Sequence, residues 1–211
     1  MISEAKYLHY LDSLLEGNKT GCIKIVNGLL EEDTPVIDIY NDIFQRSMYR
    51  VGRLWEKNRC TVAEEHSATQ ITKLCLDLVY TKISKTPKKS KTVLITCVDK
   101  EFHEIGPRMI SDYFELNGWN SMFLGTNMPG KDVIEIINDK KPDVVGISNN
   151  FYMNFLRTLK LVDNIKENNP GQKIIIGGQA LEKADINTLK KYNNVDVIKD
   201  LDDLQKYIFN N

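Results

Sequence analysis

The spacing of apolar residues changes once along the chain, near residue 84. Before that point apolar side chains recur every three or four residues, which is the period of one helix face. The pattern predicts four helices in residues 1–84, and four helices with short connections favour an antiparallel bundle. Their apolar stripes are, in chain order, Leu8, Leu11 and Leu15; Cys22, Ile25, Val26 and Leu29; Ile39, Ile43, Phe44 and Val51; and Ile71, Leu74, Cys75 and Leu78.

Helix-capping residues agree with this division. Gly17-Asn18 ends the first helix, and Asp33-Thr34-Pro35 reads as a cap followed by proline in a first turn. Thr61 is followed three residues later by Glu64, which is the capping-box pattern, so the fourth helix should begin near Val62.

The segment 85–91 is polar, contains proline and has no period, so we read it as a linker. From residue 92 to 211, short apolar runs alternate with helical stretches, which predicts a parallel sheet covered on both faces. Five strands fit a flavodoxin-like, Rossmann-like domain with strand order 2-1-3-4-5. The predicted strands are Val93 to Val98, Ser121 to Leu124, Val144 to Ser148, Lys173 to Ile176 and Val195 to Ile198.

Composition narrows the class of protein. Of 211 residues, 42% are hydrophobic and 27% are charged, and the net charge of −1 gives no field to attract nucleic acid or an anionic membrane. The basic run from Lys85 to Lys91 is better explained as a solvated linker. The start of the chain lacks a signal-peptide pattern, and no apolar run is long enough to cross a bilayer. Four cysteines without a CxxC pair suggest reduced thiols in the cytoplasm.

The candidate chemistry lies in the loop after the first predicted strand, where His103 follows Glu101 by two residues. In parallel α/β domains, ligands bind at the carboxyl ends of the strands. A histidine there can bind a metal, and a nearby carboxylate can fix its tautomer by accepting the other ring proton.

Small and polar residues also follow the other strands: Leu124-Gly125, Ser148 and Gly177-Gly178. Each is weak alone, because a glycine pair is usually a turn, a strand-end serine is usually a local hydrogen-bonding group and a lone loop histidine is usually structural. Together they mark one edge of the sheet as a ligand site.

In this order and spacing, Glu101-x-His103-x-x-Gly106, Leu124-Gly125, Ser148 and Gly177-Gly178 resemble the cobalamin-binding domain. The resemblance covers about residues 92 to 200. The family with this domain includes methionine synthase, cobalamin-dependent mutases and corrinoid methyl carriers. It implies a base-off, His-on cofactor, in which His103 binds cobalt from below. The nucleotide tail would run past Ser148 and the glycine pair. On the same resemblance, Phe102 and Ile105 join the predicted cofactor-binding residues.

The helical half resembles one branch, the light-sensing repressors of the CarH type. The stretches 51–55 and 62–69 are similar to the bundle that covers the upper face of the cofactor there. Trp55 would cover the corrin, and Glu65 and His66 would hydrogen-bond an adenosyl group; the local alternative is a core tryptophan and a helix-capping pair. Glu101 replaces the aspartate found in much of the family. Glu56 replaces the repressors' upper histidine, and no DNA-binding segment is found.

These features support two functions. The first is a sensory or regulatory module that holds adenosylcobalamin between bundle and sheet domain and responds to light. The alternative is a corrinoid methyl carrier of a methyltransferase system, holding methylcobalamin. A cofactor-free flavodoxin-like or receiver-like domain is the third option. We expect no catalytic residue, no contact with DNA or membrane, and either a regulatory or a methyltransferase protein as partner. The resemblance to the light-sensing repressors implies self-association.

Overall fold

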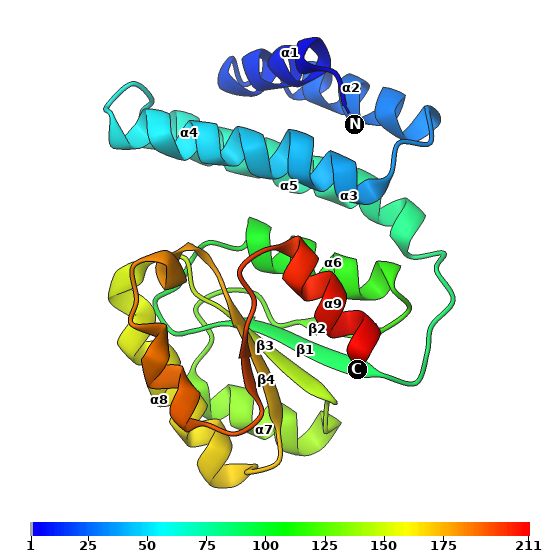
Figure 1. Cartoon of the computed structure of the whole chain (residues 1–211). Helices are drawn as coiled ribbons and strands as arrows, with labels where there is room; N and C mark the ends of the chain where they lie inside the picture. The colour runs from blue at the N-terminus through cyan, green and yellow to red at the C-terminus, as the bar shows by residue number, and fades with distance from the viewer. Residues whose placement is uncertain (1) are drawn as a thin grey trace. The chain divides into compact units, whose positions relative to one another are not determined.

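A computed structural model describes residues 2–211, which form two compact units that divide between Lys85 and Thr86 (Figure 1). The first unit is helical and the second is built on a sheet, as the change of apolar period predicts. Each unit is described by itself below.

Helices of the first unit begin and end near the predicted capping residues. They are α1 (Glu4–Leu15), α2 (Lys19–Glu31), a longer helix built of three segments, and α5 (Val62–Ile83). The three segments are α3 (Val36–Asp38), a π-helical segment η1 (Ile39–Gln45) and α4 (Arg46–Glu56). Both halves of the capping box are present at the start of α5: Thr61 Oγ1 accepts the N–H of Glu64, and the Glu64 carboxylate accepts the N–H of Thr61.

Two predicted apolar stripes are displaced in the structure. Leu8 is 46% exposed, and the buried face of α1 is formed by Tyr7, Tyr10, Leu11 and Leu14 instead. A tyrosine presents a large apolar ring, so it can replace leucine in a core; the rings of Tyr10 and Phe44 lie 5.9 Å apart. On α5, Leu74 and Leu78 are half-buried, and Leu76 and Val79 complete the core with Ile71 and Cys75.

The second unit contains one parallel sheet with strand order β2-β1-β3-β4-β5, as predicted. The strands are β1 (Thr92–Cys97), β2 (Asn120–Phe123), β3 (Val144–Ser148), β4 (Lys173–Gly177) and β5 (Val195–Val197). All four pairings are parallel, so the carboxyl ends of the strands share one edge.

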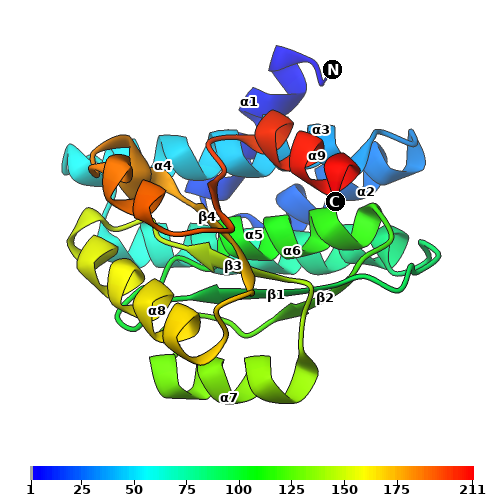
Figure 2. The same ribbon diagram turned by 60° about the horizontal axis from the view of Figure 1, so that its bottom comes forward.

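Helices cover both faces of this sheet. α6 (Ile105–Leu116) and α9 (Leu201–Asn210) lie over one face, and α7 (Gly130–Lys140) and α8 (Phe155–Asn168) over the other (Figure 2). The second layer packs against Val145, Ile147, Ile174 and Ile176. Short 3₁₀ segments complete the unit: η2 (Tyr152–Asn154) before α8, and η3 (Gln179–Glu182) and η4 (Ile186–Lys191) between β4 and β5.

Part of the segment 85–91 is attached to the sheet unit. The N–H of Lys89 donates to the carbonyl oxygen of Gly118 at 2.6 Å, and the Asn120 side chain donates to the carbonyl oxygen of Lys89 at 2.8 Å. Lys88 also forms an ion pair with Glu115 at 2.6 Å. Only the start of the segment is therefore linker-like.

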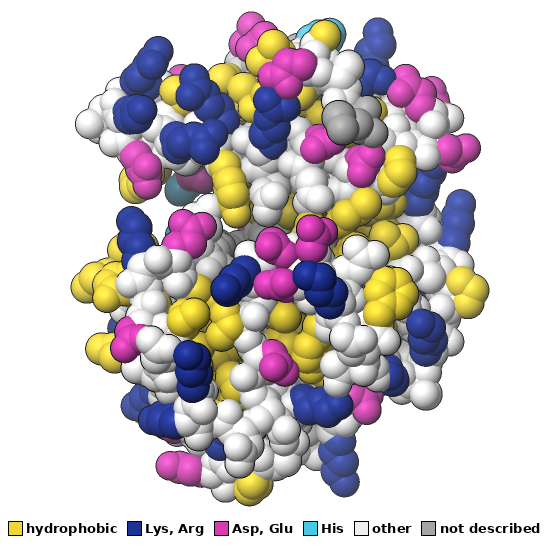
Figure 3. All heavy atoms as spheres, in the orientation of Figure 1, with side chains coloured by type: hydrophobic (Ala, Val, Ile, Leu, Met, Phe, Trp, Pro, Cys, Tyr) yellow, Lys and Arg dark blue, Asp and Glu magenta, His cyan; other side chains and the backbone are white. Residues whose placement is uncertain are grey.

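Basic side chains gather over the end of α4, on the face of the first unit drawn in Figure 3. Arg50, Arg53 and Lys57 are exposed and lie on one stripe of the helix. Cations at this end are favourable because the carbonyl groups of the last turn carry a partial negative charge.

Within residues 2–211, no helix is both long and apolar enough to cross a membrane.

Candidate functional site

Glu101 organises the loop that follows β1. Lys100 before it adopts the left-handed conformation (φ 66°), which turns the chain so that the Glu101 side chain is fully buried. The backbone of Glu101 donates to the carbonyl oxygen of Val98 at 3.0 Å and accepts the N–H of Asn127 at 2.8 Å. The loops after β1 and β2 are thereby joined.

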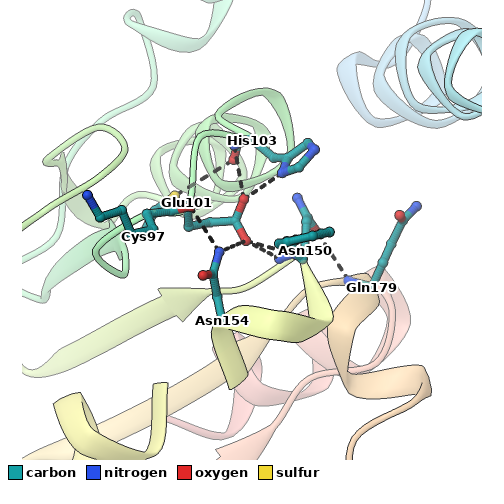
Figure 4. A network of polar contacts seen from close by, with 8 residues as sticks. Cys97, Glu101, His103, Asn150, Asn154 and Gln179 are labelled. Atoms are coloured by element: carbon teal, nitrogen blue, oxygen red, sulfur yellow. Dashed lines mark hydrogen bonds and ion pairs between the residues drawn. The ribbon is translucent and has the colours of Figure 1, made fainter. Parts of the chain in front are cut away.

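Both carboxylate oxygens of Glu101 accept hydrogen bonds (Figure 4). Oε1 accepts from the backbone N–H of His103 at 3.2 Å and lies 2.5 Å from Nδ1 of the same residue. Oε2 accepts the N–H groups of Asn150 and Phe151 at 2.9 and 2.8 Å, and the Asn154 amide at 3.5 Å. One buried side chain thus connects the loop after β1 with the loop after β3.

These donors determine the charge of the carboxyl. Burial alone would raise the pKa of Glu101, but the hydrogen bond from His103 and the backbone N–H groups of Phe151 and His103 outweigh it. The net effect lowers the pKa to about 2. Glu101 is therefore an anion at neutral pH and can accept the Nδ1 proton of His103.

His103 is placed for metal binding by this arrangement. Its side chain is 62% exposed although its partner carboxylate is buried. Because Nδ1 faces Glu101, a metal would be bound through Nε2, on the opposite side of the ring (Figure 4). Sequence reasoning anticipated this pair, and the structure contains the hydrogen bond between them.

Several contributors to this network were missed from sequence. Asn154 of η2 donates to Glu101 and to the carbonyl oxygen of Lys100, the latter at 3.0 Å. The Oδ1 of Asn150 accepts the N–H of Gln179 at 3.1 Å, which brings in the turn after β4 (Figure 4). The Asn pair after Ser148 and Gln179 after the glycine pair were visible in the sequence as polar strand ends, but nothing in the sequence indicated Asn154.

The other predicted residues of this unit lie at or beside the same edge. Ser148 ends β3 and is in register with Cys97 and Gly177, the last residues of their strands. Ile105 and Gly106 begin α6, and a Cβ at Gly106 would lie 3.9 Å from the Asn150 amide. Leu124 and Gly125 follow β2 and bond to Ile95 and Cys97. Phe102 is mostly exposed beside His103.

Gly178 cannot be replaced by another residue without strain. Its φ is +114°, and a Cβ there would lie 2.2 Å from the carbonyl oxygen of Asn149. The backbone after β4 therefore approaches the end of β3 very closely. A glycine pair that sequence alone assigns to a turn thus also sets the spacing of two strand ends.

Within the first unit, the predicted upper-face residues flank the turn between α4 and α5. Trp55 lies in the last turn of α4 and is 49% exposed. Glu65 and His66 lie in the first turns of α5; Glu65 accepts from Thr69 at 2.9 Å and contacts His66 Nδ1 at 2.6 Å. Because Trp55 is half-exposed, it is not the core tryptophan that the alternative interpretation of this segment requires.

His103 is a single candidate metal ligand. Residues 2–211 contain no group of three or more His, Cys, Asp or Glu side chains arranged to hold an ion. His103 can supply a single imidazole ligand with a fixed tautomer. That suits a metal whose other ligands come from its own macrocycle.

Comparison with known proteins identifies the family. Residues 91–201 match the family model of the B12 binding domain, and residues 9–80 match a second B12 binding domain model. The first match spans more than half of the chain, so the chain belongs to the B12-binding domain family and binds cobalamin.

Three relatives illustrate the likeness. A corrinoid protein of Desulfitobacterium hafniense is 20% identical, over 79% of this chain and 80% of its own. Trimethylamine corrinoid protein 2 of Methanosarcina acetivorans is 22% identical, over 79% of each chain. The structure of the Methanosarcina barkeri monomethylamine corrinoid protein superimposes with a TM-score of 0.84 at 15% identity, covering 98% of this chain and 99% of that one.

These relatives bear on the two functions predicted from sequence. They are corrinoid proteins, two of them named for a methylamine, so they support the methyl-carrier alternative better than the sensory interpretation. The CarH-type branch and a response to light receive no support from them. The upper ligand of the cobalt, adenosyl or methyl, is not distinguished.

Proposed function

We propose that the chain is a corrinoid methyl carrier, the subunit of a methyltransferase system that passes a methyl group on bound cobalamin between partner enzymes. The observation that carries this proposal is the pair formed by buried Glu101 and exposed His103 at the carboxyl edge of the sheet. Bound cobalamin supplies a cobalt ion that accepts and releases a methyl group. The named methylamine corrinoid relatives support this choice over the sensory one.

The residues of the sheet unit have separate roles in this proposal. His103 would hold the cobalt through Nε2, and the Glu101 anion would keep the ring in the required tautomer. Ser148, Gly177 and Gly178 border the path of the nucleotide tail. Phe102, Ile105, Gly106, Leu124 and Gly125 complete the cofactor surface.

The first unit supplies the cover of the upper face. Trp55 presents an aromatic ring at the end of α4, and Glu65 and His66 present a hydrogen-bonded pair at the start of α5. In a methyl carrier, this cover excludes water and moves aside when a partner enzyme binds.

The proposal is tested by loading the full chain with methylcobalamin and removing free cofactor by gel filtration. We expect the loaded chain to transfer its methyl group to a thiol acceptor faster than free methylcobalamin does, in the presence of a purified methyltransferase that uses protein-bound corrinoid; the thiol loses its proton to solvent and the cobalt is left as Co(I). Failure to retain the cofactor, or transfer no faster than from free methylcobalamin, contradicts it. A change of oligomer size when the adenosylcobalamin-loaded chain is illuminated with green light would favour the sensory function instead.

A single substitution tests the metal ligand. His103→Ala should weaken retention of methylcobalamin by at least the 10- to 100-fold typical of losing a ligand's supporting partner, because the cobalt loses its protein ligand. The absorption spectrum should change with it. His9→Ala, at an exposed position of α1, is the matched control and should bind normally. An unchanged spectrum in His103→Ala contradicts the assignment.

A further inference from the structure

Small residues lie along β3 and at the end of β4 on one face of the sheet, on the side covered by α6 and α9. Ser148 and Gly177 are adjacent in register at the carboxyl edge, and two residues further into the sheet Gly146 stands in register with Ile95 and Ile175. Residues in register, and residues two apart on one strand, point to the same face. The larger residues of β3, Val145 and Ile147, point into the opposite core.

Gly146 leaves room that the side chains of Ile95 and Ile175 fill in this structure. A Cβ at Gly146 would lie 2.5 Å from Cδ1 of Ile95. That atom is the flexible end of a side chain, so it can rotate away when a ligand enters. The small residues therefore run from the carboxyl edge of the sheet, at Ser148 and Gly177, to the part of the sheet that α9 covers.

A buried hydroxyl group lies in this layer. Tyr207 is on α9, and its oxygen is shielded from solvent without a hydrogen-bond partner among residues 2–211. Burial raises the pKa of Tyr207 to about 12, and the charge of nearby Asp196 adds to the effect. Asp196 stands in register with Ile175, and Ile175 with Gly146, so Tyr207 lies at the β5 end of the row that contains Gly146.

A buried hydroxyl without a partner is unfavourable, and a ligand atom that bonds to it would relieve that cost. A tyrosine hydroxyl can both donate and accept. The six-membered ring of dimethylbenzimidazole carries only methyl groups at its outer edge. The corresponding ring of adenine carries nitrogen acceptors and an amine.

We propose that Tyr207 hydrogen-bonds the lower base of the bound corrinoid and selects corrinoids whose lower base has a polar atom on its six-membered ring, such as adenine. This inference rests on the proposed function, which already places the nucleotide tail beside Ser148 and Gly177. It adds which lower base is preferred and which side chain forms a hydrogen bond with it.

The test measures equilibrium binding of four corrinoids to the full apo chain by tryptophan fluorescence. They are adeninylcobamide, cobalamin, benzimidazolylcobamide and the tailless cobinamide. We expect adeninylcobamide to bind about tenfold more tightly than cobalamin or benzimidazolylcobamide, which is the size of one buried hydrogen bond. Tyr207→Phe should remove that preference and leave cobalamin affinity within about twofold, because only the hydroxyl is lost.

Tyr192→Phe is the matched control, since the Tyr192 hydroxyl already donates to Asp163 at 2.6 Å; it should keep the preference. Equal affinities of the wild-type chain for the three tailed corrinoids, or a preference that persists in Tyr207→Phe, overturn the inference. Should Tyr207→Phe fail to fold, the wild-type comparison of adenine with benzimidazole decides alone. Failure to bind any of the four would defeat the proposed function as well, whereas tight binding without preference defeats only this inference.

Discussion

Glu101 is a buried carboxylate whose ionisation is maintained by the donors around it. Two backbone N–H groups of the loop after β3 and two N–H groups of His103 surround it. Such hydrogen bonds to the charged form are what hold the pKa near 2 despite burial. The same residue therefore fixes the site geometry and contributes to the stability of the sheet unit.

This leads to a prediction about acid. Because the folded pKa of Glu101 lies below its ordinary value of 4.5, its contribution is complete above that pH and is lost as the pH falls toward about 2. The shift corresponds to a contribution on the order of 3 kcal/mol to the free energy of unfolding. Urea titrations at pH 5 and pH 3 should show this loss in the wild-type chain, and Glu101→Gln should lack that part of the pH dependence. If the free energy of unfolding fell by the same amount between pH 5 and pH 3 in both proteins, this role for Glu101 would be excluded.

Sequence could predict the Glu101–His103 pair because the two residues are close along the chain. The spacing alone put a carboxylate within reach of the ring, and the hydrogen bond is present. Asn154 and the N–H of Phe151 could not be predicted, because their contact with Glu101 depends on how two strands pair and how the second loop turns back. Tertiary contacts over some fifty residues leave no local signal.

At the scale of elements, the turn after β4 is the part of the sheet most sensitive to substitution. Gly178→Ala should lower the free energy of unfolding by about 3 kcal/mol or more, because strained backbone and a clash with the Asn149 carbonyl act together. Gly171→Ala, where no atom lies within 4 Å of the new Cβ, should change it by less than about 0.5 kcal/mol. Urea unfolding of both variants measures the difference, and equal effects would show that the close approach is not needed.

The strands and most helices could be predicted because their buried faces leave a period in the sequence. All five strands were predicted, and the flavodoxin-like order that they fit is the order observed. The π-helical segment Ile39–Gln45 was not predicted, since its apolar residues 39, 40, 43 and 44 are also compatible with an α-helix. The exposed position of Leu8 was missed because tyrosines at 7 and 10 take the core side of α1.

At the scale of the whole molecule, each unit has its own core and one of the two tryptophans. Trp119 is buried in the sheet unit against Phe114, and Trp55 is half-exposed in the helical unit. In the Trp55→Phe variant, tryptophan fluorescence comes from Trp119 alone. It therefore reports on the sheet unit and separates its unfolding from that of the helices.

Cobalamin should raise the stability of the sheet unit by mass action. At a free cofactor concentration of about 100 times Kd, the expected gain is about 2.7 kcal/mol. Trp119 fluorescence in Trp55→Phe during urea titration, with and without cobalamin, measures it. The same titration with His103→Ala added is the control and should show a smaller gain. A gain of equal size in both would place the cofactor away from His103.

The carboxylate of Glu101 also connects the imidazole of His103 to an exposed apolar segment of the loop after β3. Its Oε1 holds the imidazole, while its Oε2 holds the backbone from which Phe151, Tyr152 and Met153 project into solvent. Removing the Glu101 carboxylate would therefore loosen the imidazole and the start of this exposed apolar segment together.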